Sequence, residues 1–301
     1  MKQNYYHDLF AKHCKDIKKT WEIMRSIIKK KNDKTSISDT FKINDQESSN
    51  PNEITNGFCN YFTNIGSDLS KKIPAPTKTY DNYMINETPI NSLFLPPCDD
   101  NEVGTIIQLL KGKKSSGHDG ISSWLIKQLR EQLCYPISLV INKSIEEGIF
   151  PDMLKMAKII PIYKAKEKDS FSNHRPISLL SSISKIYEKN IYKRLYKYIE
   201  PFLYPRQFGF RSKRSTTQAV IELNADIIES YENKDITLAT FLDLSKAFDT
   251  IDHNIILYKL ERYGIRGTPL GWFRSYLTNK PQYVMYTNIA STTSLMTTGV
   301  P

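Results

Sequence analysis

The chain has 301 residues, of which 40% are hydrophobic and 25% charged, a composition that excludes a disordered or fibrous protein and allows one large or two ordinary domains. No apolar run approaches the ~18 residues of a membrane-spanning helix, and the N-terminus lacks an apolar signal core, so we expect an intracellular protein (nucleus, cytoplasm or both) that is not secreted. The net charge of +10 excludes an acidic protein, and four scattered cysteines without a C-x-x-C pair favour reduced thiols over a disulfide framework or a zinc site.

The first hundred residues predict short helices joined by linkers. In chain order the pattern indicates a basic helical segment, a polar linker, an amphipathic helix and a proline-rich extended stretch, at residues 1–31, 32–52, 54–69 and 73–100. We therefore expect an N-terminal connector over residues 1–100, helical and partly disordered, before a main domain over residues 101–301.

Regular structure becomes dense in the main domain. Apolar spacing predicts helices at residues 102–110, 121–133, 136–147, 181–199, 253–263 and 269–277. Gly148 is expected to end the third of them. A further helix opens at the capping box Ser215–Gln218, with Val220, Leu223 and Ile227 inward.

Three strands are expected among these helices. Residues 158–164 and 175–180 predict an antiparallel hairpin, and the apolar run at residues 236–242 predicts a half-buried strand. The order of elements is mixed α/β, without the alternating rhythm of a doubly wound sheet.

The positive charge is concentrated between Leu154 and Arg214. That segment has 15 Lys and Arg against 4 Asp and Glu, whereas the rest of the chain has 27 against 28. Such a surplus is typical of a surface that binds a polyanion, and on charge alone a solvated Lys-rich surface explains it equally well. Within the segment, four lysines recur every fourth residue and form one basic stripe on the predicted helix: Lys185, Lys189, Lys193 and Lys197.

Three carboxylates follow the strand expected at residues 236–242. Asp243 stands at its end, where a bare charge is costly unless it is paired or bound to a metal. Mg²⁺ takes carboxylate and carbonyl oxygens, so Asp243 and the carbonyl of Leu244 are candidate ligands, and the ring of Phe248 is placed to stack on a sugar. Taken alone, a strand-end aspartate followed by two helix-capping acids, Asp249 and Asp252, explains the pattern better.

Five blocks in a fixed order resemble the reverse transcriptase of non-LTR (LINE-type) retrotransposons. They are SSGHDGI at 115–121, KIIPIYK at 158–164 with NHRPISLL at 173–180, QFGFR at 207–211 with Ser215 and Thr216, ATFLDLSKAFDTIDH at 239–253, and TGVP at 298–301. The resemblance covers residues 100–301 well and the first hundred weakly, where Trp21 and the basic residues after it resemble the connector that follows the endonuclease. A group II intron-type maturase has a similar polymerase palm domain, but this connector and the motif LDLSKAFD favour the LINE-type element.

The resemblance implies a right-hand polymerase fold, with fingers and the first part of the palm. It implies that Asp243 binds a catalytic metal with the Leu244 carbonyl, and that Phe248 excludes the ribose 2′-hydroxyl. It further implies that Lys164 and Arg175 contact the triphosphate. Template or primer phosphates are expected along the lysine stripe and at Arg211, Lys213 and Arg214. The implied cofactor is a pair of Mg²⁺ ions, and the implied partners are an RNA template, a DNA primer and deoxynucleoside triphosphates, without a membrane.

One departure from the family bears on activity. The other metal-binding carboxylates of the family lie in an "ADD"-type hairpin beyond the block that opens at residue 298, whereas the sequence stops at Pro301. A two-metal site with one of its three usual aspartates should not be competent. We therefore expect an RNA-directed DNA polymerase by family and no activity from this chain alone; the alternative is a non-catalytic remnant that at most binds nucleic acid.

Overall fold

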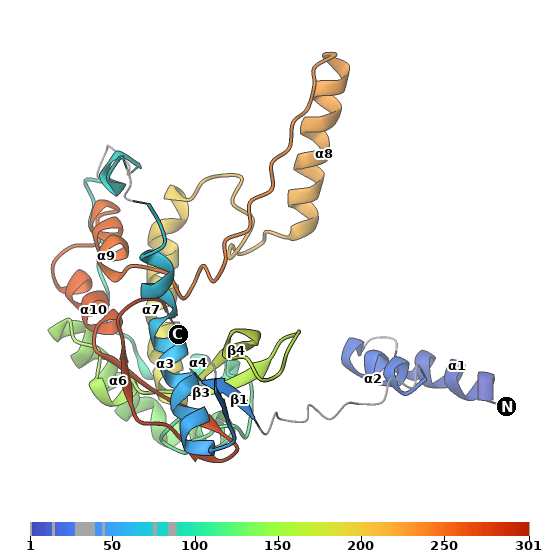
Figure 1. Cartoon of the computed structure of the whole chain (residues 1–301). Helices are drawn as coiled ribbons and strands as arrows, with labels where there is room; N and C mark the ends of the chain where they lie inside the picture. The colour runs from blue at the N-terminus through green and yellow to red at the C-terminus, as the bar shows by residue number, and fades with distance from the viewer. Residues whose placement is uncertain are drawn as a thin grey trace.

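The computed structural model describes residues 2–13, 16–27, 40–43, 46–74, 77–83 and 89–300 (Figure 1). Its α-helices are α1 (Lys2–His13), α2 (Ile17–Ile27), α3 (Pro51–Ser70), α4 (Asp100–Leu109), α5 (Ser123–Gln128), α6 (Arg130–Glu147), α7 (Ser182–Ile199), α8 (Thr216–Glu232), α9 (His253–Arg262) and α10 (Thr268–Leu277). Its strands are β1 (Phe41–Ile43), β2 (Gln46–Ser48), β3 (Ala157–Tyr163), β4 (His174–Leu179), β5 (Lys280–Tyr286), β6 (Ile289–Ala290) and β7 (Ser294–Met296). The mixed α/β content agrees with the expectation.

The main sheet is mixed, with strand order β4-β3-β5-β6 and β7 also paired to β5. β3 and β4 form the predicted antiparallel hairpin, in which Ile160 lies opposite Ile177. β5 runs parallel to β3, with Ile159 opposite Val284, and was not predicted from the sequence. Its addition turns a local hairpin into a sheet that joins residues more than a hundred positions apart.

One hydrophobic core lies among α4, α6, α7 and α10. The fully buried residues Ile106, Ile141, Ile186 and Trp272 come from these four helices. The indole Nε1 of Trp272 donates a hydrogen bond of 3.0 Å to Ser144 Oγ, so this large ring is buried without an unpaired donor. This core holds the start of α7, and with it the basic stripe, in a fixed position.

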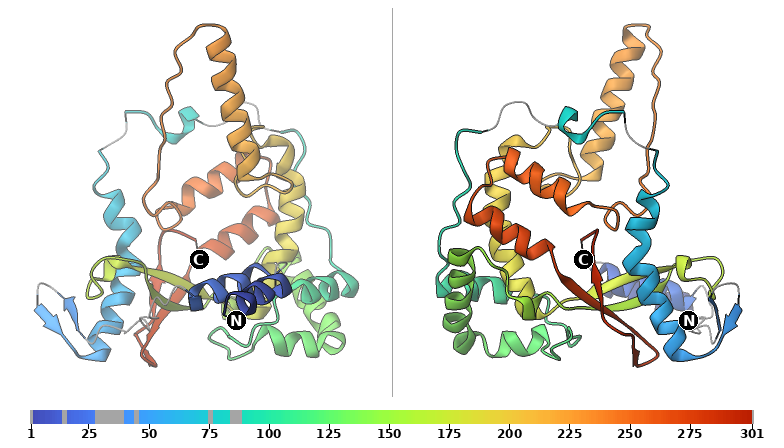
Figure 2. Two further views of the ribbon diagram at one scale, coloured as in Figure 1. Left: turned by 90° about the vertical axis from the view of Figure 1, so that its right-hand side faces the viewer. Right: turned by 60° about the vertical axis from the view of Figure 1, so that its left-hand side comes forward.

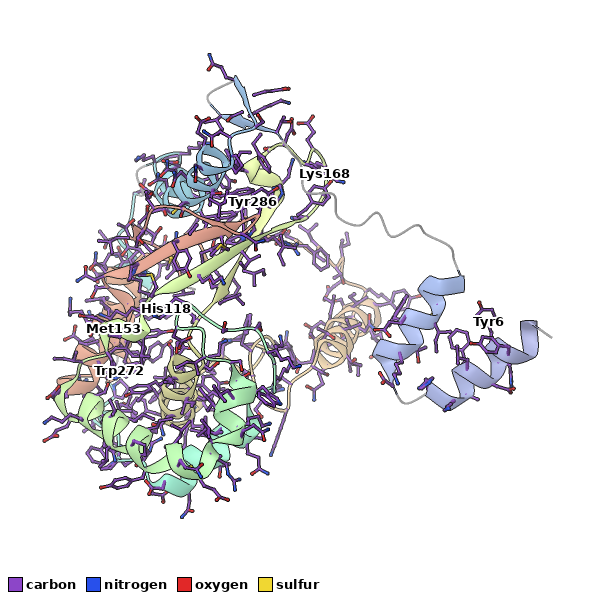
Figure 3. All side chains as sticks on the ribbon, turned by 90° about the horizontal axis from the view of Figure 1, so that it is seen from below. Tyr6, His118, Met153, Lys168, Trp272 and Tyr286 are labelled. Atoms are coloured by element: carbon purple, nitrogen blue, oxygen red, sulfur yellow. The ribbon has the colours of Figure 1, made fainter. Side chains whose placement is uncertain are left out.

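A second core joins α3 to the main sheet. Phe41 and Phe58 are fully buried with Ile159, Val284 and Tyr286, and the rings of Phe41 and Phe58 meet edge to face at 5.0 Å. Figure 3 shows Tyr286 beside this core and Trp272 well apart from it, in the first core. The helix expected at residues 54–69 is thus present as α3, and it packs on the sheet instead of standing apart from it.

The prediction of a linker at residues 32–52 is wrong for the residues of this range that the structure describes, 40–43 and 46–52. β1 and β2 form a short hairpin there, because Phe41 inserts its ring into the second core. Residues 32–39 and 44–45 lie outside the described part of the chain, and so does the expected disorder there.

The helix boundary expected between residues 133 and 136 is also wrong. The break falls at Leu129, and α6 continues through Pro136. The proline removes one backbone donor, but Ile137 and Ile141 just beyond it are buried in the first core, and this packing outweighs the lost hydrogen bond. The end of α6 was predicted correctly, because Gly148 has the left-handed backbone (φ 68°) that a glycine adopts without strain.

The strand expected at residues 236–242 does not form. Ile236 and Leu238 are 98% and 91% exposed, and no strand of the described residues pairs with this segment. A strand needs a hydrogen-bonded neighbour, so an apolar alternation alone does not make one. Helix α8 has the predicted capping box, but it stands away from the rest of the chain, so Val220, Leu223 and Ile227 are not buried (Figures 1 and 2).

Candidate active site

A compact turn follows Asp243 and leads into α9. The backbone N–H of Asp249 donates to the carbonyl of Lys246 at 3.0 Å, and Lys246 has a positive φ of 53°. Asp252 caps α9, where its Oδ1 accepts from Asn254 N at 2.7 Å and from Ile255 N at 3.1 Å. Asp252 is therefore a helix cap, which is the role that the alternative interpretation of this pattern gave it.

Residues 298–300 pack directly on this turn. The N–H of Gly299 donates to Ile251 O at 2.8 Å, and that of Val300 to Phe248 O at 3.1 Å. Gly299 has φ 83°, and a Cβ there would lie 2.9 Å from the Asp249 carbonyl oxygen, so only glycine fits both the backbone and the space. The structure thus brings together the last two of the five sequence blocks.

Helix α3 also lies against this turn. A Cβ on Gly66 would clash with the carbonyl oxygen of Asp249 and the hydroxyl of Thr298, so the absence of a side chain allows this approach. Lys246 Nζ lies 5.2 Å from the centre of the Tyr61 ring, a cation–π contact. Tyr61 and Gly66 were missed by the sequence analysis; a glycine in mid-helix, where it weakens the helix, was the available signal.

The charges around the turn influence one another. Burial raises the pKa of Asp249, and the positive charge of Lys246 opposes this rise. Burial lowers the pKa of Lys246, and the ammonium of Lys164 lowers it further. The positive charge of Lys164, just beyond β3, thus repels that of Lys246 in the turn.

Asp243 and Leu244 are exposed, with Leu244 at 75%. Beside Leu244 a cavity of about 360 Å³ lies between the end of α3 and the turn, lined by apolar groups and three hydroxyls: Leu69, Ser70, Ile73, Leu244, Ser245, Ala247 and Thr250. The described residues contain no group of three or more His, Cys, Asp or Glu side chains that could hold a metal ion.

The ring of Phe248 is 55% exposed and is not part of either core. It meets the ring of Phe210 edge to face, with centroids 5.9 Å apart. Phe210 belongs to the QFGFR block, so a third block reaches the turn.

Lys164 and Arg175 stand on the predicted hairpin, and both are exposed. Lys164 extends β3 by one hydrogen bond, from its N–H to Asn173 O at 2.8 Å, and Arg175 lies opposite Ile162 on β4. The hairpin therefore holds both cations on one pair of strands.

Several basic side chains between Leu154 and Arg214 already have partners within the chain. Arg194 forms two hydrogen bonds of 2.8 and 2.9 Å with Glu102, and Arg206 is paired with Asp226 at 2.7 Å. Arg211 donates to Tyr204 O at 3.0 Å, and Arg214 lies over the ring of Phe208. The lysine stripe is present on α7, where Lys193 and Lys197 are exposed and Lys185 and Lys189 half-buried.

Two other observations concern the turn before α5 and the length of the helices. Asp119 holds the turn, since its Oδ1 accepts from Ile121 N at 3.0 Å and its Oδ2 from Ser181 Oγ at 2.6 Å. No helix within the described ranges is long and apolar enough to cross a membrane.

Comparisons with known proteins identify the family. Residues 164–301 match the family described as reverse transcriptase (RNA-dependent DNA polymerase). Over 232 residues the chain is 33% identical to the probable RNA-directed DNA polymerase from transposon BS of Drosophila melanogaster, covering 75% of this chain and 26% of that protein. It is 34% identical over 174 residues to the RNA-directed DNA polymerase from mobile element jockey of the same species, covering 57% of this chain and 19% of that protein.

A third relative extends the same pattern. The probable RNA-directed DNA polymerase from transposon X-element of D. melanogaster is 30% identical over 210 residues, with 69% of this chain and 23% of that protein covered. The chain thus spans about a quarter or less of the length of these curated relatives. The matched residues include the lysine stripe, the turn and the block at residue 298, and by these matches the chain belongs to the reverse transcriptase family of non-LTR retrotransposons.

Proposed function

We propose that this chain is part of an RNA-directed DNA polymerase of a non-LTR retrotransposon, which adds deoxynucleotides to a primer 3′-hydroxyl on an RNA template. The names of the relatives support this activity. The observation that carries it is the meeting of three family blocks at one turn, where Gly299, Val300 and Phe210 contact the residues that follow Asp243. In this proposal residues 101–301 form the fingers and the first part of the palm, behind a connector over residues 1–100.

Asp243 and the carbonyl of Leu244 are the groups of this chain that would hold Mg²⁺. Both are exposed, and their oxygens are the hard ligands that Mg²⁺ prefers, so they fit part of such a site. When bound, a pair of such ions stabilises the charge that develops on the oxygens of a phosphoryl transfer. The described residues contain no group of three or more His, Cys, Asp or Glu side chains that would complete the site around Asp243.

The other residues near the turn would position the nucleotide. Lys164 and Arg175 would contact triphosphate oxygens, because an ammonium and a guanidinium fork suit an anion whose charge rises on the leaving group. Phe248 would block a ribose 2′-hydroxyl with its ring, which is exposed beside Phe210 and so free to meet a ligand.

Primer extension tests the proposal. The described residues contain no group of three or more acidic side chains that could hold a metal ion, so the 301-residue chain is expected to incorporate no labelled deoxynucleotide on a primed RNA template. An extended product that also carries an "ADD"-type block should be active. Asp243→Asn in that product should abolish incorporation with every nucleotide, because the lost charge holds the ions for all of them. Activity of the 301-residue chain that Asp243→Ala removes would contradict the account of an incomplete site.

The gate is tested in the same active product. Phe248→Ala should raise incorporation of ribonucleotides relative to deoxyribonucleotides by roughly ten- to two-hundred-fold in kcat/KM, the effect of about 1–3 kcal/mol of relieved contact. Phe202→Ala serves as a matched control, since this ring lies against Tyr198 and Tyr263, away from the turn. An unchanged sugar preference in the Phe248 variant would show that the ring is no gate.

A second candidate is a nucleic-acid-binding remnant without catalysis. The exposed lysines of α7 favour it, because binding to phosphates needs no metal site. Primer extension separates the two candidates. A remnant would bind a primed template, but even the extended product would not elongate the primer.

A further inference from the structure

A cavity of about 370 Å³ lies between α7 and the loop that joins α4 to α5, the loop that carries His118 in Figure 3. Lys185 and Lys189 reach it from the first half of α7. Lys111 and Lys113 reach it from the loop, beside the hydroxyls of Ser115 and Ser123. Four lysines from two separate segments thus line one cavity.

None of the four ammonium groups forms an ion pair within the described part of the chain, whereas neighbouring basic residues do, such as Lys155 with Asp152 and Arg194 with Glu102. Nearby Lys127 donates from Nζ to the carbonyls of Gln108 and Leu110. Four like charges around one cavity repel one another, and an anion between them relieves that repulsion.

The lining includes one carboxylate, Glu188, which is directed to other partners. Its Oε1 accepts hydrogen bonds from Tyr276 Oη at 3.0 Å and from Ser184 Oγ at 3.4 Å. Burial raises the pKa of Glu188, which favours its neutral form. Glu188 therefore offsets the positive charge of the four lysines only in part.

The loop is held in place by its own hydrogen bonds. Ser123 Oγ donates to Lys111 O at 2.7 Å and accepts from Lys113 N at 3.2 Å, which fixes the backbone of both lysines. Asp119 joins the loop to the start of α7 through Ser181 at 2.6 Å. The four lysine stems thus start from a preformed frame, which lowers the entropy lost when a ligand binds.

We propose that this cavity binds phosphate groups of a single-stranded nucleic acid, which then follows α7 past Lys193 and Lys197. The lysine stripe continues from the cavity along the helix, so a strand of linked phosphates matches the charges better than one free phosphate. The four lysines of the lining would contact phosphates, which carry no sequence information, so binding is expected to be independent of sequence. The inference rests on the nucleic-acid binding proposed above.

The test is fluorescence anisotropy of a labelled single-stranded oligonucleotide with the 301-residue chain at several salt concentrations. The double variant Lys111→Gln/Lys113→Gln should lower the slope of log K against log salt by roughly 1.4, or about 0.7 for each lost phosphate contact. The control variant Lys78→Gln/Lys259→Gln removes the same charge at two exposed lysines outside the cavity and should leave the slope unchanged. All four side chains are exposed, so both variants should fold, which their melting temperatures check.

Each result decides the matter. Equal slopes for the cavity variant and the wild type would overturn the cavity site and leave the proposed function intact. No oligonucleotide binding by the wild type would overturn the proposed function, and the cavity site with it. Inorganic pyrophosphate is the second probe: if the cavity variant lost pyrophosphate binding but kept the oligonucleotide slope, the cavity would hold a free polyphosphate and the strand would be excluded.

Discussion

Asn190 is a fully buried amide on α7, and neither its Oδ1 nor its Nδ2 has a hydrogen-bond partner among the described residues. An unpaired buried amide destabilises the fold by about 1–3 kcal/mol. Asn190→Leu keeps the branched outline of the side chain and removes both polar atoms, so we expect the free energy of unfolding to rise by about 1 kcal/mol. Urea unfolding measures this change. A lower midpoint for the leucine variant would show that the amide has a partner, such as a bound water molecule.

Lys280 opens β5 and is almost fully buried, with its Nζ 3.6 Å from the centre of the Tyr276 ring. Burial lowers the pKa of Lys280 to about 8, while Glu188 raises it and Lys155 lowers it further. Between pH 8 and the ordinary pKa of 10.5, the unfolded chain therefore holds a proton that the folded chain has lost. Stability from this group thus rises with pH across that range and is lost below pH 8.

Lys280→Met removes this charge, so at pH 7 the variant should be more stable than the wild type by roughly 1–3 kcal/mol. The difference should shrink between pH 8 and pH 10, as the wild type gains stability. Melting temperatures over this range measure the effect, with the exposed Lys259→Met as the control for a lost surface charge. A constant difference across the range would mean that Lys280 does not titrate there.

At the scale of elements, α3 positions the turn that follows Asp243. The contact depends on Gly66, where a Cβ would clash with Asp249 and Thr298. Gly66→Ala should therefore lower the free energy of unfolding by about 1–3 kcal/mol and speed hydrogen exchange of the Gly299 amide, which bonds to Ile251.

Gly271→Ala on α10 is the matched control for this change. A Cβ there would make an ordinary contact of 3.6 Å with Gly148 O, so alanine should stabilise the helix by roughly 0.5–1 kcal/mol. Equal effects of the two substitutions would show that α3 does not press on the turn.

Two segments show why the local sequence pattern predicts only part of the fold. β5 was missed because the first two side chains of its buried face, Lys280 and Gln282, are polar, and only Val284 and Tyr286 after them are apolar. Gln282 is buried because its amide donates to Thr63 on α3 at 2.9 Å, a partner 219 residues away. The strand expected at residues 236–242 shows the opposite case. Its apolar alternation is clear, but no described strand pairs with it, so no strand forms.

At the scale of the whole molecule, we predict that the chain binds nucleic acid with steep salt dependence and little sequence preference. Lys193→Gln/Lys197→Gln should lower the slope of log K against log salt by roughly 1.4, because two phosphate contacts are lost. Arg206→Gln should change the slope less than either of these lysine changes, since Arg206 is already paired with Asp226. A flat slope for the wild type would mean that the basic residues are solvated surface only.

The sequence by itself determined the family, the β3–β4 hairpin, α7 with its lysine stripe and the capping box of α8. Each depends on residues close together in the chain, where backbone preferences and apolar spacing act directly. It also named Asp243, Phe248 and Lys164 as candidates, whose roles stay predictions. Only the tertiary structure decided that α3 packs on the turn, that residues 298–300 bond to it, and that Arg194 is already neutralised by Glu102. These contacts join segments 40 or more positions apart, and they depend on steric fit and burial, which no local pattern records.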